Sequence, residues 1–166
     1  MSVNRHLSRT VAMQSIYEWD FRPDEPLNDI VRRNIEVYKD DVDEGYVIQV
    51  VEGIKKNITE IDASIVNVAP EFPIEQIATI DKAILRVAIY EILHDNDVPA
   101  KVAINEAVEL GKNFGGESSY KFINGVLGTL YRQSARFDPN DEKILEPIDE
   151  IVDGDINTDD IKEDSK

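Results

Sequence analysis

Apolar residues recur along most of the chain at intervals of three and four positions, the spacing that gathers them on one face of an α-helix. The sequence shows neither the regular alternation of a half-buried strand nor an internal repeat. Short links, several marked by proline or glycine, separate the periodic segments. The pattern predicts an all-α bundle of about seven helices. The expected helices span residues 5–19, 27–38, 42–57, 60–69, 78–94, 99–113 and 118–133.

The segment "IATIDKAILRVAIYEIL", residues 77–93, is apolar on nearly all of its faces. The charged residues that interrupt it are Asp81, Lys82, Arg86 and Glu91. A helix that is hydrophobic all round is normally buried within a fold. We therefore expect this segment to form the central helix of the bundle.

The composition excludes several classes of site. With 166 residues the chain has the size of one ordinary domain, and without cysteine it forms no disulfide, no thiolate metal site and no cysteine nucleophile. No apolar run approaches the roughly 18 residues of a membrane span, and the first residues lack the apolar core of a signal peptide. These features favour a cytoplasmic protein that does not contact a membrane.

Charge is distributed unevenly along the chain. The formal net charge is −16, and residues 138–166 alone carry twelve Asp and Glu against three Lys. Residues 1–17, in contrast, contain Arg5 and Arg9 and no acidic residue. The sequence thus predicts a helical domain at 1–137, a largely disordered acidic tail at 138–166, and a small basic corner at the start of the first helix.

Arg5, His6 and Arg9 occupy the first turns of the first expected helix, where cations oppose the helix dipole. Helix stability therefore does not account for them. The free N–H groups of a helix N-terminus attract anions, and three outward-facing cations would strengthen that field, so the pattern is typical of a phosphate site. The alternative is a frayed N-terminus whose arginines are solvated.

A second candidate lies in "GGESSYKFINGVLGTLY", residues 115–131. Ser118 or Ser119 can cap the helix, and Lys121 stands next to Phe122 in its early turns. An aromatic ring beside a cation can stack on an unpaired base while the cation holds a phosphate. The alternative places Phe122 in the core and Lys121 on the surface.

The sequence singles out no catalytic centre. "HDND", residues 94–97, resembles a metal cluster, but it stands at a helix end, where Asp and Asn are ordinary capping residues. "GKNFGG", residues 111–116, lacks the spacing of a phosphate-binding loop. We therefore expect no enzyme, no metal and no cofactor.

Four stretches of the chain share a family pattern. In chain order they are "AMQSIYEWDF" (12–21), "IDKAILRVAIYEIL" (80–93), "DVPAKVAINEAVELGKNFG" (97–115) and "SSYKFINGVLGTL" (118–130). Together they resemble the NusB family of transcription antitermination factors. The resemblance implies an all-helical fold of two packed helical bundles. It also implies joint binding of boxA-like single-stranded RNA with the small-subunit ribosomal protein that acts as Nus factor E, and an indirect link to RNA polymerase and other Nus factors.

The resemblance gives the basic corner a role. The family carries an arginine-rich motif at the start of its first helix, and Arg5, His6 and Arg9 stand at the matching positions. Leu7 stands where the family often has another arginine. Since RNA affinity grows with the number of phosphates neutralised, the depleted motif predicts weak RNA binding by the chain alone.

The resemblance also implies roles for residues outside the basic corner. Tyr17 on the first helix and Lys121 with Phe122 on the last match positions that the family uses around RNA. Asp81 and Arg86 match positions near the partner surface. The expected RNA site therefore combines the two ends of the chain, and the expected partner site lies on the central helix.

The residue patterns and the resemblance together predict a non-enzymatic antitermination adaptor. It is expected to bind boxA-like RNA of ribosomal RNA leaders when the ribosomal protein completes the site. Two alternatives stay open: a purely protein-binding helical module, and a ribosomal RNA biogenesis factor with weak or no autonomous RNA binding. The acidic tail either folds over the Arg5/Arg9 corner as an RNA mimic or serves only solubility. Monomer and homodimer are both compatible with the sequence.

Overall fold

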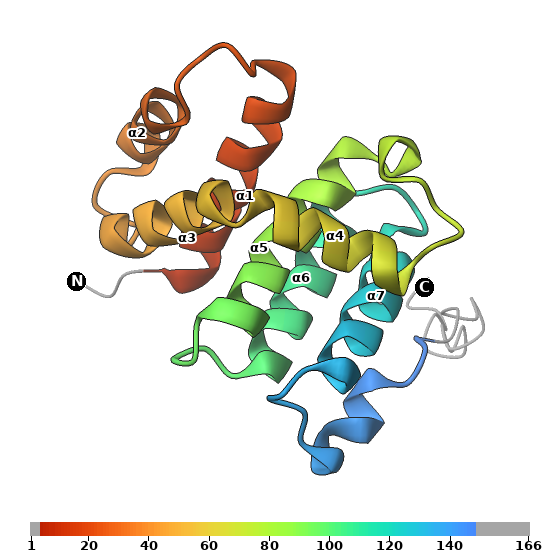
Figure 1. The fold of residues 1–166 in the computed structure, drawn as a ribbon. Coiled ribbons are helices and arrows are strands. Elements are labelled where there is room, and N and C mark those ends of the chain that lie inside the picture. The colour runs from red at the N-terminus through yellow and green to blue at the C-terminus, as the bar shows by residue number, and fades with distance from the viewer. Residues whose placement is uncertain (1–3, 149–166) are drawn as a thin grey trace, which may run out of the picture.

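The computed structural model describes residues 4–148, a range that contains seven α-helices and two short 3₁₀ helices and no strand (Figure 1). The all-α prediction is therefore confirmed, and the second helix has the predicted bounds. The predicted tail beyond residue 148 lies outside the described residues. The α-helices are α1 (Arg5–Phe21), α2 (Leu27–Tyr38), α3 (Glu44–Lys56), α4 (Ile58–Val68), α5 (Thr79–His94), α6 (Ala100–Phe114) and α7 (Ser119–Gln133). The 3₁₀ helices are η1 (Ile74–Gln76) and η2 (Pro139–Leu145).

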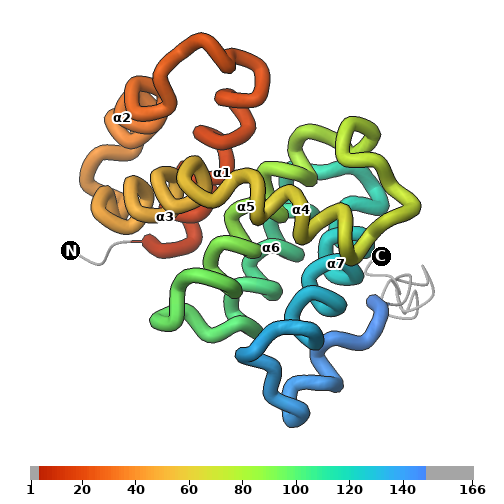
Figure 2. Tube along the Cα trace, viewed as in Figure 1, coloured from red at the N-terminus to blue at the C-terminus, as the bar shows by residue number. Residues whose placement is uncertain are grey.

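Helix α5 lies at the centre of the fold, as its apolar sequence predicts. It contacts α1, α3, α4, α6 and α7. Figure 2 shows α1, α2 and α3 grouped on one side of α5, and α6 and α7 on the other. The expectation of two packed helical groups is confirmed, and α5 joins them.

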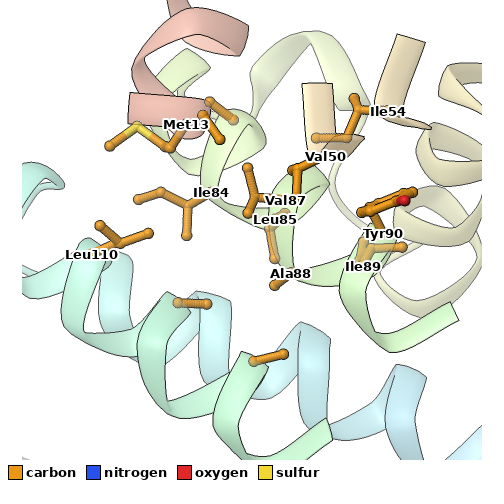
Figure 3. Close-up of a cluster of buried hydrophobic side chains, with 14 of the residues drawn as sticks. Met13, Val50, Ile54, Ile84, Leu85, Val87, Ala88, Ile89, Tyr90 and Leu110 are labelled. Atoms are coloured by element: carbon orange, nitrogen blue, oxygen red, sulfur yellow. The ribbon is translucent and has the colours of Figure 1, made fainter. Parts of the chain in front are cut away.

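The core forms where the helices meet around α5. Ile84, Leu85 and Ile89 on this helix are fully buried. Figure 3 shows Met13 of α1 and Leu110 of α6 pointing toward the same cluster. Burying side chains of this size stabilises the fold by roughly 1.5–3 kcal/mol each, before the cost of ordering the chain. The core therefore fixes α1 against α5, the two helices that carry Arg9 and Glu91.

The contact between α3 and α5 depends on a glycine. A Cβ atom at Gly53 would lie 2.1 Å from Cε2 of Tyr90, closer than any real contact. The aromatic ring therefore packs directly on the α3 backbone, and only glycine allows this approach.

Arg86 ties three helices together beneath the surface. Its Nε and Nη2 each donate to Asp62 of α4 at 2.9 Å, and its Nη1 donates to Asp20 of α1, also at 2.9 Å. Burial opposes the charge, but the two carboxylates raise the pKa of Arg86 above its ordinary value. With 6% of its surface exposed, Arg86 is buried and satisfies two carboxylates of its own chain. Its expected place near the partner surface stays a prediction.

Residues 138–148, here named the strap, pack against α7. Leu145 is buried, and the hydroxyl of Tyr131 donates to Asp141 Oδ2 at 2.6 Å. Arg132 forms an ion pair with Glu142 at 2.8 Å. The predicted domain boundary at residue 137 therefore does not coincide with a change in packing: part of the acidic segment pairs with side chains of α7.

Within residues 4–148, no helix is long and apolar enough to span a membrane. The same range contains no group of three or more His, Cys, Asp or Glu side chains placed to hold a metal ion. His94, the first residue of the "HDND" stretch, stacks on Tyr90 and has its Nε2 3.5 Å from Glu60.

Candidate nucleic-acid and partner interface

Two of the three cations at the start of α1 lie at the surface, and each faces a carboxylate. Arg5 is 49% exposed, its Nη2 lies 3.4 Å from Asp43 Oδ2, and its guanidinium lies 4.2 Å from the centre of the Tyr46 ring. His6 is 43% exposed, and its Nδ1 lies 2.6 Å from Glu106 Oε2. The basic corner of the sequence is therefore partly neutralised in the fold by carboxylates from α6 and from the residue that precedes α3.

Arg9, in contrast, is buried. Only 6% of its side chain is exposed, and it donates from Nε and Nη2 to the carboxylate of Glu91 at 2.9 and 3.0 Å. Glu91 itself is 1% exposed. Burial opposes the charge on Arg9, but the hydrogen bonds and charge of Glu91 raise the pKa of the guanidinium. The expectation that Arg9 faces outward toward phosphate is wrong, because it balances a buried carboxylate on α5.

Glu91 is a residue whose role the sequence analysis missed. Its signal was present, since it is a carboxylate inside a helix that is apolar on nearly all faces. A buried charge is normally paired, so Glu91 predicts a buried cation somewhere in the fold. The sequence does not say which cation, and the structure shows that it is Arg9.

The start of α7 is held by the turn before it. Ser119 was one of two expected capping residues, but its Oγ accepts a hydrogen bond from the backbone amide of Gly116 at 2.9 Å and also bonds to Asp81 of α5. A Cβ atom at Gly115 would lie 2.4 Å from Cβ of Ser119, so this turn requires glycine. The turn therefore fixes Lys121 and Phe122, both half-buried, relative to α5.

Phe122 does not stand alone. Its ring meets the edge of Phe72, with the ring centres 5.4 Å apart and the planes at 74°. Phe72 is 45% exposed. Sequence analysis missed Phe72, although it lies between Pro70 and Pro73 in a segment that the helical pattern leaves out. The two rings give the surface a pair of aromatic side chains next to Lys121.

This aromatic pair lines two hollows. One is a groove of about 230 Å³, whose lining residues are Val68, Ala69, Glu71, Phe72, Lys121, Phe122, Gly125, Val126 and Thr129. The other is a hollow of about 170 Å³, lined by Phe72, Gln76, Ile77, Ala78, Asp81 and Phe122. An exposed aromatic ring with a cation near it can hold a stacked base and its phosphate.

Asp81 is a buried carboxylate at the second hollow. It is 8% exposed, and its Oδ1 has no hydrogen-bond partner in the described part of the chain. Burial raises the pKa of Asp81, and the hydrogen bond from Ser119 offsets this only in part. An unsatisfied buried acceptor of this kind lowers the stability of the folded chain.

We expect Asp81→Asn to raise the free energy of unfolding by about 1 kcal/mol at pH 7, because it removes a poorly satisfied buried charge. The folded-state pKa is raised, so Asp81 makes the wild type lose stability as the pH rises from about 3.9, the unfolded-state value, through the folded-state value. The variant lacks this loss. Urea unfolding between pH 3 and pH 7 measures both effects, with the exposed Glu75→Gln as control. A destabilised Asp81→Asn would contradict this account.

The structure does not bring all predicted RNA residues together. Arg9 pairs with Glu91 near the end of α5, whereas Asp81 lies near its start, a rise of roughly 15 Å along the helix. Phe122 lies at the Asp81 end. Tyr17 is half-buried and meets the edge of Phe21, with ring centres 4.9 Å apart.

Tyr17 belongs to the part of α1 that lies toward the start of α5. Early in α1, Arg9 pairs with Glu91 late in α5. Later in α1, close to Tyr17, Asp20 pairs with Arg86, which comes before Glu91 on α5. The two helices therefore run in opposite directions. The basic corner and the aromatic pair are therefore two separate surfaces, and Tyr17 lies away from the first.

The sequence and the fold are both similar to those of known proteins. The NusB family model matches residues 6–132. A transcription antitermination protein NusB from Dehalococcoides mccartyi is 39% identical over 135 residues, which cover 81% of this chain and 94% of that protein. The structure of T. maritima NusB aligns with a TM-score of 0.76 at 28% identity and covers 87% of this chain and 99% of that one. A crystal structure of antitermination factors NusB and NusE in complex with dsRNA contains the same fold, with a TM-score of 0.71 at 23% identity over 78% of this chain and 97% of that one. The chain belongs to the NusB family.

Proposed function

We propose that this chain is a non-enzymatic antitermination adaptor of the cytoplasm. It binds boxA-like single-stranded RNA of ribosomal RNA leaders together with the ribosomal protein that acts as Nus factor E, and through that complex it acts on RNA polymerase. Family membership supports the general role, and one structure of the same fold contains antitermination factors NusB and NusE in complex with double-stranded RNA. The observation that carries the proposal in this chain is the aromatic pair of the exposed Phe72 and the half-buried Phe122 beside Lys121.

The aromatic pair supports recognition of unpaired bases. Every base has a π face that can stack on an aromatic ring, and single-stranded RNA leaves those faces accessible. Lys121 lies at the groove in the first turns of α7, where the helix dipole also favours a phosphate. No acidic residue stands in the first turn of α7. This surface therefore suits a short run of stacked nucleotides.

The basic corner supports a dependence on the partner. Arg5 and His6 each face a carboxylate, and Arg9 is buried, so this corner neutralises few phosphates. A protein with few phosphate contacts binds RNA weakly at physiological salt. A ribosomal protein that supplies further cations and a donor for Asp81 would raise the affinity.

The test is RNA binding by the chain alone and with the Nus factor E protein of its own organism, across a salt series. The RNA is the organism's ribosomal RNA leader, and a scrambled sequence of the same length is the control. We expect weak binding by the chain alone and an affinity at least tenfold higher with the partner present. Equal affinity with and without the partner would contradict the adaptor mechanism.

One observation favours the second candidate, a purely protein-binding helical module. Each arginine or histidine at the start of α1 already has a carboxylate of the chain beside it. If the chain bound the ribosomal protein but the pair gave no RNA signal at any salt concentration, this module would be the better description.

A further inference from the structure

The strap leads toward the aromatic groove. Tyr131 near the end of α7 bonds to Asp141, whereas Asn124 near its start donates to the backbone carbonyl of Glu146 at 3.3 Å. Between them, a Cβ atom at Gly128 would lie 3.5 Å from the carbonyl oxygen of Leu145. The strap therefore runs antiparallel to α7, toward the end that carries Lys121 and Phe122. Figure 2 shows the described chain ending beside α7.

The last described residue lies close to the groove. Ile148 is half-buried against the core, and Asn124, which holds Glu146, is next to Gly125 in the groove wall. Gly125 is exposed, and a Cβ atom there would meet nothing within 4 Å. The described chain therefore ends two residues after Glu146, which Asn124 holds beside the groove wall.

The sequence beyond the strap fits such a surface. Ile148, Ile151, Val152 and Ile156 stand at the spacing that places side chains on one face of a helix. Four of the five positions between them are Asp or Glu, and residues 149–166 carry eight Asp and Glu against two Lys. The groove offers two aromatic rings for the apolar residues and Lys121 for the carboxylates.

We propose that residues 149–156 dock in the Phe72–Phe122 groove and compete there with RNA. The competition rests on the function proposed above, whereas the docking does not. The groove is a better candidate than the Arg5/Arg9 corner, because it offers the apolar side chains of Phe72 and Phe122 to the apolar residues of the segment. Glu71 also lines the groove, so apolar contacts must supply much of the attraction.

Docking of residues 149–156 is expected to lower RNA affinity only moderately. A segment tethered this close has an effective concentration in the millimolar range, so even a weak contact is partly occupied. RNA must displace it to reach Phe122. We therefore expect the tail to lower RNA affinity roughly three- to tenfold.

Docking is measured first without RNA. The chain contains no cysteine, so Asn157→Cys, directly after the proposed segment, introduces a single site for a nitroxide spin label and keeps the apolar residues of the segment. In NMR spectra of the full chain, we expect the label to broaden the amide signals of Phe72, Lys121 and Gly125. The control is Ser165→Cys, near the end of the chain. Uniform broadening from both labels, or none, would overturn the docking.

The same spectra identify other occupants of the groove. When a labelled chain is mixed with an unlabelled, isotope-enriched chain, broadening in the enriched chain would assign the groove to a second copy and overturn intramolecular docking. Broadening that is confined to the labelled chain and does not change on dilution would support it.

RNA binding then tests the competition. In the full chain, Ile151→Ser with Val152→Ser removes the apolar contacts and keeps the charge, and Ile161→Ser is the matched control. We expect a three- to tenfold gain in RNA affinity for the double variant and none for the control. Equal affinity of all three proteins would overturn the competition. Absence of RNA binding by all of them, with docking intact, would instead contradict the proposed RNA function.

Discussion

Replacement of Arg9 by methionine is expected to lower the free energy of unfolding by about 3–5 kcal/mol. The guanidinium makes two short hydrogen bonds to Glu91, and both side chains are almost fully buried. Methionine fills most of the volume but cannot balance the carboxylate, so Glu91 would be left as an unpaired charge in the core. Urea unfolding at pH 7, followed by circular dichroism, measures the loss.

Two further variants separate this effect from a general sensitivity of α1. Arg5→Met removes a half-exposed ion pair, and we expect it to change the stability by no more than about 1 kcal/mol. The double variant Arg9→Met with Glu91→Met removes both buried charges, and we expect it to recover most of the stability that Arg9→Met loses. If Arg9→Met were no more destabilising than Arg5→Met, the buried pair would not have the structural role assigned to it.

The double variant also tests whether Arg9 contacts RNA. Once the fold is restored, the structure predicts RNA affinity within about twofold of the wild type in the presence of the partner, because a side chain 6% exposed makes little contact with a ligand. A large loss of RNA affinity in a stably folded double variant would show that Arg9 contributes to RNA binding.

The helices of this protein could be predicted from local pattern alone. Periodicity set the bounds of α2 at residues 27–38, and the all-round apolar character of residues 77–93 identified α5 as the central helix. These predictions succeed because helix formation depends on neighbours three and four residues away and on the burial of one face. The same information is present in any short window of the sequence.

The roles of Arg9 and Arg86 could not be predicted in this way. Both stand at helical positions where a cation can face either solvent or a buried carboxylate. Arg9 is 82 residues from Glu91 and Arg86 is 66 residues from Asp20, so no local window contains both members of either pair. Local pattern shows which face of a helix carries a charge but not which side chain of another helix will meet it.

The strap and Phe72 were missed for a different reason. The dense acidic charge after residue 137 predicted disorder, yet Leu145 is buried and Asp141 accepts from Tyr131. Composition averages over a segment and hides single residues that pack. Phe72 lies outside every predicted helix, where periodicity carries no information about burial.

Phe122→Leu is expected to lower the RNA affinity of the complex between this chain and its ribosomal partner about tenfold. Leucine keeps the apolar contact with Phe72 but lacks the flat ring on which a base stacks, and base stacking contributes about 1–3 kcal/mol per base. Because no charge changes, the dependence of the affinity on salt should stay the same. Fluorescence titration with labelled leader RNA across a salt series measures both quantities.

Lys121→Gln is the matched control, since it changes charge and leaves the ring in place. It should weaken binding and also reduce the slope of log affinity against log salt by about 0.7, the value for one phosphate contact on a single strand. Weaker binding with an unchanged salt slope for Phe122→Leu, and weaker binding with a reduced slope for Lys121→Gln, would separate stacking from charge at these adjacent residues of α7. If Phe122→Leu bound RNA as tightly as the wild type, Phe122 would serve only to pack against Phe72, and the RNA site would have to lie on another surface of the protein.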